Sequence, residues 1–147
     1  MKLTVEKLKE WKACKEGIEW FINQDESDGV KVIEKLISEG QLEWASWTIC
    51  RIFNRKQNIQ YAVFSAEQVI DLFEKKYPGD KRPRNAIEAA KKVLEKDTVK
   101  NRAAAWAASA AARAAARAAC DTSAAASAAA EKEMKIKILN YGLGLMI

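Results

Sequence analysis

The feature that most restricts the fold of this chain is a low-complexity, alanine-rich segment at residues 103–130. Within it the tetrapeptide Ala-Ala-Ala-Arg occurs twice in succession, at 110–113 and 114–117. Alanine is the strongest helix former because its side chain loses no rotational entropy in a helix. A solitary alanine helix would bury little surface. We therefore expect two helices, ending near Cys120 and before Gly142, packed as a tight antiparallel hairpin against larger side chains.

Helical periodicity also runs through the first hundred residues. Apolar side chains recur every three or four positions in five further segments, approximately 4–23, 30–38, 42–53, 59–76 and 83–96. Thr4 and Asp28 are suitable N-caps, and Pro83 suits a first helical turn. Isoleucine alternates with lysine only at Lys135–Leu139, where we expect a helix end or an irregular tail. The chain is predicted to be all-α, a single-domain bundle of about seven helices.

Size and charge bear on the domain organisation. The chain has 147 residues, which fits one domain better than two. Residues 1–80 form a mixed-charge half with an aromatic core and hold 12 basic and 14 acidic side chains. Residues 81–147 form a basic, alanine-rich half with 13 basic and 6 acidic side chains. The net charge of +5 thus arises in the second half, which indicates either an anionic partner or packing against the acidic half.

Several function classes are excluded by residues that the chain lacks. It contains no histidine, which removes Ser-His-Asp and Cys-His nucleophiles and HExxH metal sites. Cys14, Cys50 and Cys120 have no metal-site spacing, so we expect reduced, buried thiols. No signal sequence, membrane-spanning run or Gly-rich phosphate loop is present. The sequence therefore predicts a cytoplasmic, non-enzymatic protein without metal or cofactor.

The densest charged turn of the sequence contains Asp80, Lys81, Arg82 and Arg84. Two guanidiniums and a lysine beside a helix N-terminus could bind an anion, because the free N–H groups there favour negative charge. The alternative is an internal clamp. Glu67 and Glu74 lie at the edge of the apolar stripe of the 59–76 helix and could pair with either arginine. Both interpretations stay open, with the clamp favoured.

A second candidate site lies on the helix expected from about residue 98 to 120. Arg102, Trp106, Arg113 and Arg117 fall on one stripe at 100° per residue, among alanines. Arginines can bind phosphate while an indole stacks on a base, so the stripe suits a phosphate-bearing ligand. The alternative is an ordinary solvated face.

The N-terminal half is rich in tryptophan. Trp11, Trp20, Trp44 and Trp47 recur at helical spacings within its predicted helices. Indoles are large and apolar, so core or hairpin packing is the favoured interpretation. An exposed pair among them would instead mark an interface.

A family resemblance becomes apparent over residues 12–130. Its matching residues are Ala66-Glu67-Gln68-Val69, Phe73-Glu74, Pro78, Asp80, Arg82-Pro83-Arg84 and Ala86-Ile87-Glu88-Ala89, followed by the alanine-rich stretch. Cys14-Lys15-Glu16-Gly17 and Trp20-Phe21 are similar to the N-terminal segment of phage-type relatives. The chain resembles the putative immunity protein family of bacterial genomes, which has phage-encoded members. The resemblance implies an all-α protein that binds and neutralises something.

Three hypotheses follow. The favoured one is a non-catalytic protein that captures an anionic small molecule, such as a nucleotide immune signal, or an acidic protein, as an immunity or anti-defence protein would. The second is a nucleic-acid-binding protein, which uses the same charges but lacks a groove-reading motif. An enzyme is the least favoured. We also expect self-association, because alanine helices bury little area per residue.

Overall fold

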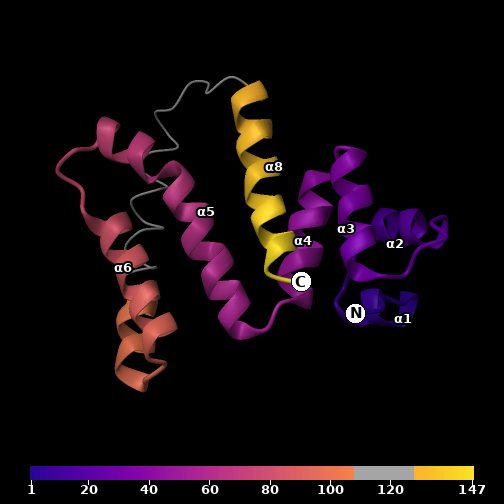
Figure 1. Ribbon diagram of the computed structural model, residues 1–147, viewed down its shortest axis with the longest axis horizontal. Helices are drawn as coiled ribbons and strands as arrows, with labels where there is room; N and C mark the ends of the chain where they lie inside the picture. Colours follow the sequence, from indigo (N-terminus) through magenta and orange to yellow (C-terminus); the bar gives the residue numbers. More distant parts are fainter. Residues whose placement is uncertain (108–127) are drawn as a thin grey trace. The chain divides into compact units, whose positions relative to one another are not determined.

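The computed structural model describes residues 1–107 and 128–147 (Figure 1). These residues are all-α, as predicted, and their one β-type feature is an isolated bridge between Lys2 and Asp28. The chain divides into two compact units. Unit 1 contains residues 1–54 and 135–147, and unit 2 contains residues 55–134. This division does not test the prediction of a single domain, because two compact units can still unfold together as one.

Unit 1 contains four short helices, α1 (Val5–Glu10), α2 (Lys15–Ile22), α3 (Gly29–Ser38) and α4 (Leu42–Ile52). The predicted N-caps are confirmed. Thr4 Oγ1 accepts a hydrogen bond from the Lys7 N–H at 3.3 Å, and Asp28 Oδ1 accepts from the Val30 N–H at 3.0 Å. The apolar core of the unit includes fully buried side chains from its beginning, middle and end, namely Leu3, Ile33, Ile49 and Leu139.

The prediction of one helix over residues 4–23 is wrong, because the chain turns between α1 and α2. Lys12 has a φ of 60°, the left-handed conformation that ends many helices. The Ala13 N–H donates to the Leu8 carbonyl and the Lys12 N–H to that of Lys9, the paired bonds of a Schellman motif. Cys14 then begins α2, and its Sγ accepts from the Gly17 N–H at 3.4 Å.

Unit 2 begins with two antiparallel helices, α5 (Arg55–Lys76) and α6 (Arg82–Glu95) (Figure 1). The apolar stripe predicted for the 59–76 segment forms their contact. Val63 and Ile70 of α5 are buried with Ile87 of α6. Residues 99–107 are again helical, and Thr98 Oγ1 accepts from the Asn101 N–H at 3.1 Å. The predicted starts of the second and third of these helices are confirmed, with Pro83 in the first turn of α6. The first, α5, begins at Arg55, four residues before the predicted start at 59.

The last helix is α8 (Ala128–Gly144), which passes from unit 2 into unit 1 between residues 134 and 135. It corrects the prediction of a helix end or irregular tail at Lys135–Leu139, which lies in its middle. Ile136 and Leu139 are three positions apart, and Leu139 is buried, so helical spacing prevails over the alternation. The body of the predicted alanine hairpin, including Cys120, lies at 108–127, outside the described residues.

The prediction of buried thiols is also wrong for the two cysteines that the structure describes. Cys14 and Cys50 are exposed and form no disulfide, whereas Cys120 lies outside the described residues. None of the described helices combines the length and hydropathy that a bilayer crossing requires. Within residues 1–107 and 128–147, no three side chains of the metal-binding types cluster.

Candidate binding sites

The charged turn of unit 2 contains a local ion pair between Asp80 and Arg82. Arg82 Nε donates to Asp80 Oδ1 at 2.9 Å, and Nη2 donates to Oδ2 at 2.7 Å. The Arg82 backbone N–H also donates to Oδ1, at 3.0 Å. These bonds hold the pKa of Asp80 below its usual value and raise the pKa of Arg82. The carboxylate therefore occupies the forked donor set that an external anion would need.

Arg84 is paired across the two helices. Its Nε and Nη2 donate to Glu74 Oε1 and Oε2 at 2.6 and 2.7 Å, and Nη2 lies 3.6 Å from Asp71 Oδ1. The hydrogen bonds from Arg84 hold the pKa of Glu74 below its usual value. Glu67 pairs with Lys91, at 2.9 Å, rather than with either arginine. This geometry supports the clamp interpretation for Glu74 and Arg84.

Lys81 is the remaining cation of this turn. It precedes α6, is exposed, and forms no ion pair with any described residue. Lys92 and Lys96 are also exposed, and neither forms an ion pair with any described residue. At 100° per residue the three lysines fall within about 60° of one another around the α6 axis. We call Lys81, Lys92 and Lys96 the lysine row.

The stripe predicted on the next helix is described only at its beginning. Arg102 Nε donates to Asp97 Oδ1 at 2.6 Å, and Arg55 Nη2 lies 3.9 Å from the same oxygen. Arg102, the first member of the stripe, therefore already has a carboxylate partner within the chain. Trp106 is 75% exposed. The other two arginines, Arg113 and Arg117, lie outside the described residues.

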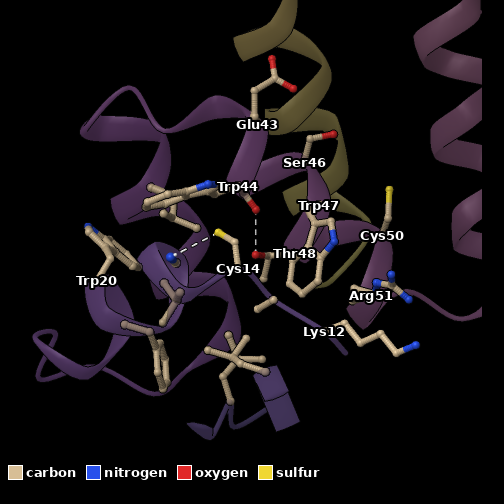
Figure 2. A pocket seen from close by; sticks show the side chains of 17 residues that line it. Lys12, Cys14, Trp20, Glu43, Trp44, Ser46, Trp47, Thr48, Cys50 and Arg51 are labelled. Carbon is tan, nitrogen blue, oxygen red and sulfur yellow. Dashed lines mark hydrogen bonds between the residues drawn. The ribbon is translucent and has the colours of Figure 1, made fainter. Parts of the chain in front are cut away.

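A pocket of about 810 Å³ lies in unit 1, among α1, α2, α3 and α4 (Figure 2). Three indoles line it, those of Trp20, Trp44 and Trp47. Side chains of the buried core complete it, including Leu8, Phe21, Val32 and Leu36. We call this the tryptophan pocket.

The indoles of the tryptophan pocket are held by specific contacts. Trp20 and Trp44 meet edge to face, with ring centroids 6.5 Å apart. The Trp20 Nε1–H donates to Glu39 Oε2 at 2.7 Å. Trp47 meets Trp11 edge to face at 6.3 Å, and the Arg51 guanidinium lies 5.3 Å from a Trp47 ring centroid. The aromatic walls therefore have defined orientations.

Sequence reasoning treated these tryptophans as packing and did not predict the tryptophan pocket. Trp20, Trp44 and Trp47 are half-buried, so each contributes to packing and to an open surface. One local signal was present: Arg51 follows Trp47 by four positions on α4, a spacing that places a cation over a ring on a helix face.

Comparison with known proteins identifies a family to which most of the chain is similar. Residues 49–139 match the family model described as Imm-5 like putative immunity protein. The chain belongs to this family. Residues 1–56 match a second family model, the YdhT N-terminal domain. No curated protein and no solved structure matches this chain significantly.

The two family matches follow the two units closely. The YdhT match ends at residue 56 and the immunity match begins at 49, while unit 1 gives way to unit 2 after Asn54. The lysine row belongs to the immunity-like segment. The tryptophan pocket is lined by residues 3–51, which all lie within the YdhT match, and Cys50 and Arg51 lie in the overlap of the two matches.

Proposed function

We propose that this protein is a non-catalytic, immunity-like protein that neutralises an acidic protein target by binding it through the lysine row. Family membership over residues 49–139 supports a role in binding rather than catalysis. The observation that carries the proposal is the set of exposed lysines along and beside one face of α6, none of which forms an ion pair with a described residue. Such a face attracts acidic partners and steers their approach.

The length of the lysine row favours a protein surface over a single small anion. Lys81 and Lys96 are fifteen positions apart, which is about 22 Å along a helix axis. One phosphate cannot contact both ends, whereas a row of carboxylates on a protein can. The arginines that would give a compact phosphate site, Arg82, Arg84 and Arg102, already bind carboxylates of the chain itself.

A photo-crosslinking and rescue experiment tests the proposal. A benzophenone amino acid replaces Asn85, an exposed residue of α6 that lies between Lys81 and Lys92 on the same face. We expect irradiation in the host cell to yield an adduct with an acidic protein. That protein, expressed alone, should slow growth, and the wild-type chain should restore it.

Charge-matched variants identify the surface responsible. The test variant carries Lys81→Gln, Lys92→Gln and Lys96→Gln, and the control carries Lys9→Gln, Lys35→Gln and Lys137→Gln. Exposed ion pairs contribute about 0.2–1 kcal/mol each, so the test variant should bind the target roughly tenfold more weakly. Equal binding by both variants, or an adduct with nucleic acid whose affinity falls steeply with salt, would contradict the proposal.

Sequestration of a nucleotide-like immune signal is a second candidate function, supported by the 75% exposure of Trp106. An exposed indole one turn after Arg102 could stack on a base while Arg113 and Arg117 bind phosphate. A native mass spectrum of protein purified from its host would then contain a nucleotide mass. Arg113→Glu with Arg117→Glu should abolish that mass and Lys9→Glu should not, while a spectrum of the bare chain would reject this candidate.

A further inference from the structure

We propose that the tryptophan pocket of unit 1 binds a small aromatic anion, with rings between the indoles and the anionic group at Lys12 and Arg51. This site lies in the unit that does not contain the lysine row, and the proposal does not depend on an acidic protein target. It rests on the size of the pocket, the orientation of its walls and the charge at its rim.

The size and lining of the tryptophan pocket define the body of the ligand. A volume of about 810 Å³ lies within the range of about 300–1,000 Å³ typical of small-molecule sites. Leu8, Phe21 and Leu36 offer no hydrogen bonds. Thr48 Oγ1 is already committed to the Trp44 carbonyl, 2.7 Å away. In the described part of the chain, no buried side-chain nitrogen or oxygen lacks a partner. A largely apolar ligand body therefore fits this lining.

The orientation of the indoles favours an aromatic body over an aliphatic one. The planes of Trp20 and Trp44 meet at 62°, so the two walls present ring edges and ring faces in different directions. Aromatic rings gain from both arrangements beyond the area they bury. The bond from Trp20 to Glu39 and the contact of Trp47 with Trp11 restrain two of the indoles before a ligand arrives. This restraint reduces the entropy lost on binding.

The positive charge at the rim of the pocket favours an anionic group on the ligand. Lys12 and Arg51 both line the pocket, and Figure 2 shows them on the side of Trp47, away from Trp20. Neither forms an ion pair with any residue that the structure describes. The one carboxylate of the lining, Glu43, is engaged by Lys135 Nζ at 2.7 Å.

The position of Arg51 relative to Trp47 lets one ligand contact both side chains. Arg51 stacks on Trp47, and a stacked guanidinium retains edge N–H groups that can donate to an oxyanion. A ring against Trp47 and an anionic group at Arg51 can therefore be bound together.

A pair of fluorescent probes tests both halves of the proposal. Anilinonaphthalene sulfonate is an aromatic anion, and N-phenylnaphthylamine has nearly the same rings without the charge. We expect one sulfonate probe to bind per folded chain, to accept excitation energy from tryptophan and to raise the melting temperature. The neutral probe should bind more weakly, because it forms no bond with the rim.

Variants separate the anion contact from the aromatic contact. Arg51→Gln should weaken the sulfonate probe about tenfold, the value of a charge-assisted hydrogen bond, and change binding of the neutral probe little. Trp44→Leu should weaken both probes. Lys35→Gln, at an exposed position of α3 in the same unit, is the control and should affect neither.

Two results would overturn the proposal. One is unchanged sulfonate binding in Arg51→Gln that still melts like the wild type. The other is probe binding that appears only with loss of the near-ultraviolet circular dichroism, which would indicate a loosened chain rather than a pocket. Arg51→Gln should still restore growth in the target-rescue assay, so failure of this proposal is distinguishable from failure of the lysine-row proposal.

Discussion

The two units use positive charge in opposite ways. Unit 1 holds ten basic and ten acidic residues, whereas unit 2 holds fifteen basic and ten acidic residues and so carries the whole net charge of +5. Four of the five arginines in the described part of the chain lie in unit 2, and each is within ion-pair distance of a carboxylate. The fifth, Arg51 of unit 1, stacks on an indole instead.

This difference shows which basic residues are available to a partner. A guanidinium has a planar fork of donors that matches a carboxylate, so arginines of a compact unit find internal acids readily. A lysine ammonium has no such preference for a bidentate partner. In unit 2 the arginines are therefore engaged by carboxylates of the chain itself, whereas the lysine row forms no ion pair with the described residues. In unit 1, Lys12 and Arg51 of the tryptophan pocket likewise form no ion pair with any described residue.

The largest expected effect concerns whether the two units form one cooperative domain. Ile87→Ala removes a core side chain of unit 2 and should lower the free energy of unfolding by about 2–5 kcal/mol. Four of the five tryptophans lie in unit 1, so tryptophan fluorescence follows that unit, while far-ultraviolet circular dichroism follows all helices. For the predicted single domain, Ile87→Ala should shift both thermal transitions equally, because α8 continues from one unit into the other.

The reciprocal variant completes this test. Ile33 is fully buried in unit 1, and Ile33→Ala should also shift both transitions together. If Ile87→Ala moves the dichroism transition and leaves the fluorescence transition in place, the units are independent domains and the single-domain prediction fails.

Much of the fold could be predicted because it depends on local chemistry. The stripe from Ile59 to Ile70, the cap at Asp28 and the proline at the start of α6 are all signals within a few residues of one another. The break after α1 could not be predicted, because Lys12 has no intrinsic preference for a positive φ and the apolar spacing continues across it. At Lys135–Leu139, two periodicities were both present and only burial distinguishes them.

The sites were less predictable than the helices. The pair Glu74–Arg84 was within reach, since both residues flank one turn between helices. The tryptophan pocket was not, because Lys12, Trp20 and Trp44 come from separate elements that only tertiary packing brings together. Composition identified unit 2 as basic, but it could not tell which cations had internal partners.

An intermediate effect on stability is expected at Lys12, whose backbone is strained and whose side chain lines the tryptophan pocket. Lys12 adopts a φ of 60°, which costs a residue with a Cβ roughly 1 kcal/mol relative to glycine. Lys12→Gly should stabilise unit 1 by up to about 1 kcal/mol, less the entropy that glycine adds to the unfolded chain. The same change removes a rim cation, so binding of the sulfonate probe should weaken while the melting temperature rises. A variant that loses both stability and binding would contradict the assigned role of Lys12.

The smallest effect concerns the exposed clamp of unit 2, and its signature is its pH dependence. Arg84 lowers the pKa of Glu74 below the usual 4.5 in the folded protein. The carboxylate is therefore stabilised by folding, and its contribution is present above about pH 4.5 and is lost as the pH falls through the folded pKa. At pH 7, Glu74→Gln should melt below the wild type, and the two melting temperatures should converge on acidification. Asp71→Asn is the matched control, because its carboxylate lies 3.6 Å from Arg84 and is 82% exposed, so its difference from the wild type should be smaller. A Glu74→Gln difference that persists undiminished at pH 3 would show that this side chain stabilises unit 2 by packing rather than by its charge.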